Sequence, residues 1–188
     1  MTLIDFFVPG IPKPGGSKTA QVVRRKGGAM VMVPDGRGGE RPLISVRDDA
    51  KGNGEWKQQV AFFARKHICE RSLAGFPIPP KVPLRCRVVF VIQRLASHYG
   101  TGRFAGVPKP SAPIFPTTKP DSTKLMRALE DALTGVLWHD DSQVVAPLPV
   151  RIYGDKPGAR VIVDHMPRAY VGGGEVDVEG LFAVETAV

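Results

Sequence analysis

The chain reads DSTKLMRALEDALTG over residues 121–135, and this stretch has the clearest periodicity in the sequence. From Leu125 to Leu133 apolar residues recur at spacings of three and four, which places them on one face of an α-helix. Gly135 follows, at a position where helices commonly end in a left-handed residue that glycine adopts without strain. The sequence therefore predicts an amphipathic helix over residues 122–134 that packs against a core.

Strands and a second helix are predicted on both sides of this helix. Alternating or β-branched apolar runs indicate four strands, over residues 4–8, 84–93, 144–153 and 160–165. Residues 55–70 repeat with helical spacing, and the basic, glycine-containing run 17–49 indicates a hairpin that is either exposed or ordered by a partner. This element order predicts a single α+β domain whose mixed sheet carries two main helices on one face.

Length and composition are those of a globular protein with one domain. We expect residues 1–168 to form that domain and the acidic residues 169–188 to form a flexible tail. No apolar run approaches the roughly 20 residues needed to span a bilayer, and no signal peptide is recognised, so a cytoplasmic protein without a membrane partner is expected. Cys69 and Cys86 are too few for a disulfide framework or a cysteine-rich zinc site, and both are expected to be buried.

Positive charge is the strongest compositional feature, with a formal net charge of +8. A cationic protein attracts polyanions through counterion release, and nucleic acid is the commonest polyanionic partner. Solubility alone explains the same charge equally well. Composition therefore makes nucleic-acid binding a hypothesis that depends on the motifs.

The run PGIPKPGGSKT at residues 9–19 is similar to a phosphate-binding P-loop only in its last residues. Ser17 stands where that loop needs glycine, and Pro12 and Pro14 lack backbone N–H donors. We therefore exclude a nucleotide cofactor. Lys13 and Lys18 are interpreted either as contacts to a DNA backbone or as part of an exposed turn.

Carboxylates stand at both ends of the predicted helix. Asp121 precedes it, and Asp140 and Asp141 follow it. A helix of about 13 residues is roughly 20 Å long, and six extended residues span about the same distance, so the chain can return and bring Asp141 beside Asp121. Clustered carboxylates repel one another unless a cation neutralises them. Mg²⁺ prefers oxygen ligands and is predicted to bind Asp121, Asp141 and Asp140, with Mn²⁺ able to substitute.

Three basic residues lie on or beside the start of this helix: Lys119, Lys124 and Arg127. Together with the helix dipole they can hold a phosphate group and stabilise its charge. Ordinary structural roles explain the same residues: Asp121 as an N-cap and residues 140–142 as a turn. Lys124 and Arg127 can likewise be ion-pair partners of Glu130 and Asp131 on a solvated face. Spacing alone does not decide between the two interpretations.

The segment 119–145 resembles the signature of the RusA-like Holliday-junction resolvases, in which a K-P-D-x-D-N-L-x-K helix start leads through D-A-L to D-D-x-Q-V. The matching segments are KPD at 119–121, DAL at 131–133 and DDSQVV at 140–145. Residues 9–18 and the helix around Trp56 also resemble phage members of that family. The resemblance implies an α+β homodimer that binds four-way DNA junctions and cuts two strands symmetrically with Mg²⁺. It further implies that Asp121 and Asp141 are the catalytic acids, with Asp140 assisting.

The sequence departs from the signature at three positions near the helix start. Thr123 replaces the second acid of the pair, Lys124 replaces an Asn, and Arg127 replaces the catalytic Lys. Losing a carboxylate removes a metal ligand, and Arg keeps the charge but does not donate a proton at neutral pH.

Three hypotheses follow from these observations. The first is an Mg²⁺-dependent endonuclease for branched DNA, with Asp121, Asp141, Arg127 and Asp140 in catalytic roles. The second is a catalytically weak junction-binding protein in which Thr123 marks a lost metal site. The third is a basic structural protein without enzymatic activity, which the absence of salt-sensitive DNA binding would favour.

Overall fold

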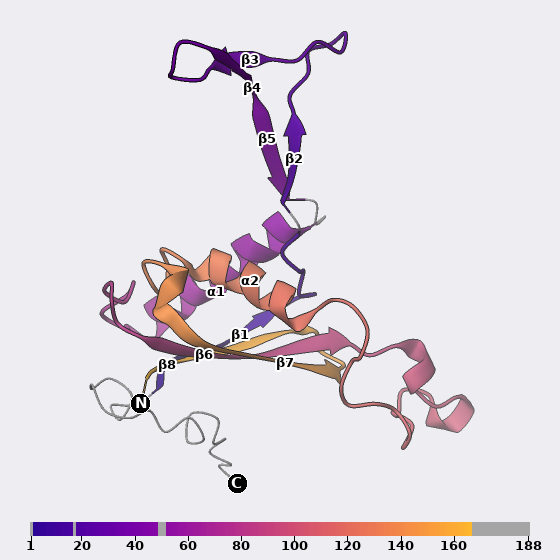
Figure 1. The fold of residues 1–188 in the computed structure, drawn as a ribbon. Helices are drawn as coiled ribbons and strands as arrows, with labels where there is room; N and C mark the ends of the chain where they lie inside the picture. Colours follow the sequence, from indigo (N-terminus) through magenta and orange to yellow (C-terminus); the bar gives the residue numbers. More distant parts are fainter. Residues whose placement is uncertain (1, 17, 49–51, 167–188) are drawn as a thin grey trace, which may run out of the picture.

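A four-stranded sheet forms the centre of the molecule in the computed structural model, which describes residues 2–16, 18–48 and 52–166 (Figure 1). Its strands are β1 (Thr2–Pro9), β6 (Leu84–Gln93), β7 (Val144–Gly154) and β8 (Gly158–His165). They lie in the order β1-β8-β6-β7, with β6 and β7 parallel and the other neighbours antiparallel. The sheet is mixed, and the four predicted strands are confirmed.

The last two strands are consecutive in sequence but are not neighbours in the sheet. The turn at residues 154–158 carries the chain past β6, so that β7 pairs with one edge of β6 and β8 with the other. Alternation of apolar residues predicts a strand but not its partner, because every strand with one buried face has the same pattern. As a result β7 is an edge strand, paired on one side only.

Two helices, α1 (Asn53–Glu70) and α2 (Ser122–Leu133), pack together on one face of the sheet (Figure 1). The buried residues of α2 are Leu125, Met126, Ala128, Leu129, Ala132 and Leu133. They belong to the same hydrophobic core as the buried side chains of β6, which alternate as Leu84, Cys86, Val88 and Phe90. The predicted α+β fold, with a single domain and two helices on one face, is confirmed.

Cys69 is exposed, and the prediction that both cysteines are buried was wrong for this residue. Cys69 follows the buried Ala64 of α1 by five residues, and 100° per residue turns it about 140° away from the core side of the helix. Cys86 is buried as predicted, and this burial strongly raises the pKa of its thiol.

Residues 18–48 form an arm that projects away from the sheet and helices (Figure 1). Its strands are β2 (Lys18–Val22), β3 (Met32–Pro34), β4 (Glu40–Pro42) and β5 (Ile44–Asp48). β2 pairs with β5 to form a stalk, and β3 pairs with β4 at its outer end. The hairpin predicted over residues 17–49 is therefore a branched ribbon with more than one turn.

The remaining elements are three short 3-10 helices: η1 (Ala96–His98), η2 (Gly102–Phe104) and η3 (Asp141–Gln143). No helix in the described part of the chain combines the length and apolarity needed to span a membrane. The predicted domain end at residue 168 and the predicted tail over 169–188 lie outside the described residues.

Candidate functional site

The start of α2 borders an open groove of about 410 Å³. Its lining residues are Ile11, Pro12, Lys13, Pro14, Lys119, Pro120, Asp121 and Lys124. The backbone N–H of Gly15 donates to the carbonyl of Lys124 at 2.8 Å, which holds the N-terminal loop against the helix. Four predicted site residues therefore line one groove: Lys13, Lys119, Asp121 and Lys124. Lys13 lies more than 100 residues before the other three in sequence.

The carboxylate of Asp121 makes no capping hydrogen bond, although the residue occupies the N-cap position of α2. Its side chain is 53% exposed, and the Lys124 ammonium lies 3.8 Å from it. Asp121 is therefore the N-cap residue by position, as the structural interpretation expected, but its side chain does not cap the helix. The carboxylate lies exposed at a helix N-terminus, and its ion-pair partner is the Lys124 ammonium.

Arg127 is exposed on α2 and forms no ion pair with the described residues. The expected pairing of the basic residues with Glu130 and Asp131 does not form: Lys124 pairs with Asp121, and Asp131 pairs with Lys57 of α1 at 2.6 Å. Arg127 is thus available to an anionic ligand.

Thr123 and Lys18 complete the predicted residues at this end of the molecule. Thr123 is exposed in the first turn of α2. The backbone of Lys18 begins β2 at the base of the arm, and its side chain lies outside the described atoms.

Arg151 of β7 was not predicted, yet it fixes the segment that leads into Asp121. Its guanidinium Nη1 donates to the carbonyl of Thr118 at 2.7 Å and also to the carbonyl of Pro120. Its partners are backbone oxygens, so no residue type in the sequence identifies them. We assign Arg151 a positioning role for the Asp121 carboxylate.

Replacing Arg151 by Met is expected to lower the free energy of unfolding by about 1 to 3 kcal/mol, because two hydrogen bonds from a charged donor are lost. Any activity that uses the Asp121 carboxylate should fall further than stability explains, because Asp121 loses its support. Urea unfolding and the rate of that activity measure the two effects. The control is Arg160→Met, which removes an exposed pair with Asp5 and should change stability by less than about 1 kcal/mol. Equal effects of the two variants would contradict the positioning role.

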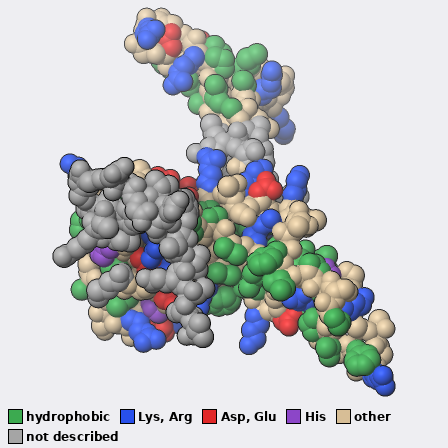
Figure 2. All heavy atoms as spheres, turned by 60° about the horizontal axis from the view of Figure 1, so that its bottom comes forward, with side chains coloured by type: hydrophobic (Ala, Val, Ile, Leu, Met, Phe, Trp, Pro, Cys, Tyr) green, Lys and Arg blue, Asp and Glu red, His purple; other side chains and the backbone are tan. Residues whose placement is uncertain are grey.

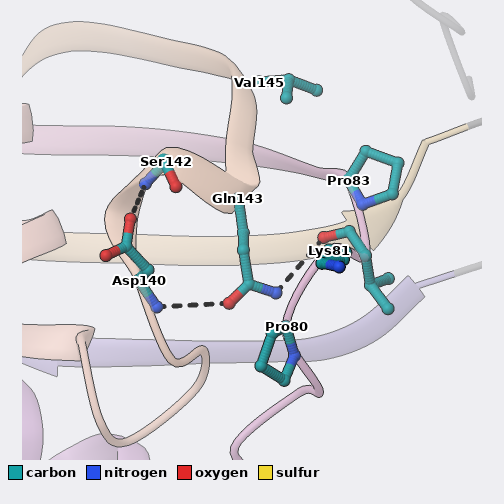
Figure 3. A pocket seen from close by; sticks show the side chains of 8 residues that line it. Pro80, Lys81, Pro83, Asp140, Ser142, Gln143 and Val145 are labelled. Atoms are coloured by element: carbon teal, nitrogen blue, oxygen red, sulfur yellow. Dashed lines mark hydrogen bonds between the residues drawn. The ribbon is translucent and has the colours of Figure 1, made fainter.

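The other predicted acids lie in η3 and the turn before it, at the beginning of β7 (Figure 3). The backbone N–H of Ser142 donates to Asp140 Oδ1 at 2.9 Å. The Gln143 side chain accepts N–H donors from His139 and Asp140 at 3.0 and 3.2 Å. Hydrogen bonds from the hydroxyl and the backbone of Ser142 lower the pKa of Asp140. Asp140 is therefore ionised and caps a turn, as the structural interpretation predicted.

Gln143 is buried and connects this turn to a second loop. Its Nε2 donates to the carbonyls of Pro79 and Val82 at 2.8 and 3.3 Å. An adjoining hollow of about 300 Å³ is lined by Pro80, Lys81, Val82, Pro83, Asp140, Ser142, Gln143 and Val145 (Figure 3). Neither Gln143 nor Lys81 was predicted to take part in the site.

Asp141 lies near Glu130 of α2. Glu130 is half-buried, and its pKa is raised by burial and then by the charges of Asp141 and Asp131. Nine residues separate Asp121 from Glu130, which corresponds to roughly 14 Å along the helix. Asp141 therefore lies within electrostatic range of Glu130, which is nine residues along α2 from Asp121.

The segment after α2 explains the position of Asp141. Gly135 has φ of +76° and donates its N–H to the carbonyl of Trp138 at 2.7 Å, while Leu137 N–H donates to the carbonyl of Leu133 at 2.9 Å. This compact turn replaces the expected extended return along the helix. Among the described residues, no group of three or more His, Cys, Asp or Glu side chains is arranged to hold a metal.

Glu130→Gln is expected to raise the melting temperature at pH 7 by about 2 °C. The folded-state pKa of Glu130 lies above its ordinary value of 4.5, so its contribution to stability is present below pH 4.5 and is lost as pH rises through the folded pKa. Gln removes that loss, so the gain should vanish near pH 4. Thermal unfolding at the two pH values tests this, with the exposed Glu70→Gln as control. A gain that persists at pH 4 would contradict the electrostatic cause.

Comparison with known proteins gives a match to a family model and a match to an individual protein. A family model described as endodeoxyribonuclease RusA matches residues 41–164. The uncharacterized protein YqaN of Bacillus subtilis (strain 168) is 28% identical over 120 residues, which cover 64% of this chain and 78% of YqaN. The family match includes both helices, Asp121 and Asp141, and it leaves out the arm before residue 41.

Proposed function

The chain belongs to the RusA endodeoxyribonuclease family, and from this premise we propose that it is an Mg²⁺-dependent endonuclease that cuts four-way or related branched DNA by paired nicks. The observation that carries the proposal is the groove at the start of α2, where the uncapped Asp121 carboxylate lies among Lys13, Lys119 and Lys124. We expect it to act in DNA recombination and repair, in the cytoplasm of a bacterial or phage-infected cell.

The groove suits a DNA backbone because its charges are arranged for phosphate. The three lysines and the positive end of the α2 dipole attract a phosphate group without reading its base. Arg127, exposed and without an ion pair among the described residues, is placed on the same helix to stabilise charge that develops on the phosphate. Binding should therefore depend strongly on salt.

The available carboxylates fit an open Mg²⁺ site. Mg²⁺ keeps several waters and typically binds one or two carboxylates together with substrate phosphate oxygens, so a closed cage of three acids is not required. Asp121 makes no capping hydrogen bond and lies 3.8 Å from the Lys124 ammonium, while burial and then the charges of Asp141 and Asp131 raise the pKa of Glu130. We propose Asp121 and Asp141 as the ligands, with Asp140 assisting by holding the turn. When bound, the ion polarises the phosphate and lowers the pKa of an attacking water.

A homodimer can bring these two ligands together in one site. Asp141 acts on the pKa of Glu130, nine residues along α2 from Asp121, and two copies related by two-fold symmetry can pair Asp121 of each chain with Asp141 of the other. The same symmetry provides two sites for two nicks in a junction. We therefore propose that the active form is a dimer in which each site uses both chains.

A catalytically weak junction-binding protein is the second candidate. Thr123 stands exposed where the family signature has an acid, and no metal-holding group of three appears among the described residues. A threonine hydroxyl orients water but supplies no charge to a metal. This candidate predicts tight junction binding without cutting.

Cleavage of a labelled four-way junction beside a linear duplex of matched sequence tests the proposal, with Mg²⁺ or EDTA. We expect paired, Mg²⁺-dependent nicks confined to the junction, absent in Asp141→Asn and retained in the control Asp5→Asn, whose exposed carboxylate pairs with Arg160. Junction binding without cutting in Mg²⁺ or Mn²⁺ would support the second candidate. Failure to bind DNA in a salt-sensitive way would reject both.

A further inference from the structure

The outer end of the arm divides into two hairpins on one stalk. Three backbone hydrogen bonds join their bases: Val23 N–H to the Leu43 carbonyl, Val31 N–H to the Val23 carbonyl, and Leu43 N–H to the Val31 carbonyl, at 2.8 to 2.9 Å. The first hairpin covers residues 24–30, and the second covers residues 32–42. Both are therefore held at the same distance from the body of the protein.

The first hairpin is strongly basic. Residues 18–34 include Lys18, Arg24, Arg25 and Lys26 and no acidic residue. Arg24 donates to the carbonyl of Gly28 at 2.8 Å and so stabilises the turn. Arg25 and Lys26 are exposed and form no ion pair with the described residues. Figure 2 shows Lys and Arg side chains at the outer end of the arm.

The second hairpin has no charge excess. Its two cations, Arg37 and Arg41, are balanced by Asp35 and Glu40. The Asp35 carboxylate accepts the N–H groups of Arg37 and Gly39 at 2.7 and 2.8 Å, which fixes that turn and lowers the pKa of Asp35. The two hairpins thus share a stalk and differ in net charge.

We propose that the first hairpin binds the phosphate backbone of a duplex arm of the substrate, away from the branch point; the identity of that substrate rests on the proposed function. Arg25 follows Lys18 by seven residues, an extended distance of about 23 Å, which corresponds to roughly seven base pairs at 3.4 Å each. The stalk begins beside the loop that Gly15 anchors to α2, so DNA in the α2 groove lies within its reach.

Charge favours DNA over a second copy of the chain as the occupant. Exposed apolar side chains on the arm, such as Met30 and Ile44, would also suit a protein surface. The chain carries a net charge of +8, however, so a basic hairpin meets repulsion on another copy and attraction on a phosphate backbone. The first hairpin also precedes residue 41, where the family match begins, so the inference concerns this chain rather than the family domain.

The test compares Arg25→Gln/Lys26→Gln with the control Arg37→Gln/Arg41→Gln, each of which removes two exposed charges from one hairpin. Dissociation constants are measured against salt for junctions with arms of 6 and 20 base pairs. For long arms we expect the first variant to bind roughly 10- to 30-fold more weakly at physiological salt, with a salt slope smaller by up to about 1.8. For short arms, and for the control variant, the change should stay within about twofold.

An unchanged salt slope on long arms, or an equal loss in the control variant, would overturn the proposal. So would a weaker dimer in sedimentation without a change in DNA binding, because the hairpin would then contact protein. Measuring the salt dependence of binding to a linear duplex as well tests the hairpin independently of the proposed function. A wild-type protein without junction preference contradicts the function, while the difference between the two variants still decides the role of the hairpin.

Discussion

An equimolar mixture of the Asp121→Asn and Asp141→Asn proteins is expected to regain junction nicking that neither variant shows alone. Each variant alone should cut more than about 100-fold more slowly, because even the hydrogen-bond partners of metal ligands are worth 10- to 100-fold. In a mixed dimer one site carries both substitutions and the other carries none, if each site combines Asp121 of one chain with Asp141 of the other. Statistical mixing then restores about a quarter of the wild-type sites.

The measurement uses two affinity tags to isolate the mixed dimer and a labelled junction to score its products. Single nicks should dominate, since only one site per dimer is intact. A mixture of Asp121→Asn with Asp121→Ala is the matched control, because every site in it lacks Asp121. If the isolated mixed dimer stays inactive while the wild type cuts, the two acids do not form a site across chains.

Gln143→Leu should lower the free energy of unfolding by about 2 to 4 kcal/mol. The substitution keeps a similar volume but leaves two N–H groups and two carbonyls at a buried position without their partner. Cutting should fall as well, because the turn that carries Asp140 and Asp141 is released from the loop of Pro79 and Val82.

Urea unfolding measures the stability change, with Gln58→Leu on the exposed face of α1 as control. An exposed substitution of this kind typically changes stability by no more than about 0.5 kcal/mol. A Gln143 variant as stable as the control would show that solvent replaces the lost hydrogen bonds. It would also remove the structural reason for expecting weaker cutting.

The fold was predictable because its main elements have strong local periodicity. The spacing from Leu125 to Leu133 predicted α2 and its buried face, and Gly135 marked its end. The position of β6 between the last two strands was not predictable, since pairing depends on the packing of the whole sheet. The branching of the arm was not predictable either, because its exposed residues show little of the hydrophobic periodicity that indicates strands.

The layout of the candidate site differs from the one expected from the sequence. The segment from Gly135 to Asp141 was expected to run extended, yet its apolar residues Val136, Leu137 and Trp138 are buried and fold back under the end of α2. The chain length would allow an extended conformation, but the free energy gained by burying these apolar side chains favours the compact turn. The roles of Arg151 and Gln143 involve backbone carbonyls, which every residue carries, so sequence alone does not indicate them.

The edge position of β7 limits how two copies can assemble. Pro147 and Pro149 interrupt this strand, and because its pairing with β6 is continuous, the missing N–H donors fall on the outer edge. A second chain therefore cannot continue the sheet past β7 without losing hydrogen bonds at both positions. The prolines also protect the edge from the strand-to-strand aggregation to which open sheets are prone. Self-association at this end of the sheet is thus left to side chains, and Val150, which is 46% exposed, remains available for it.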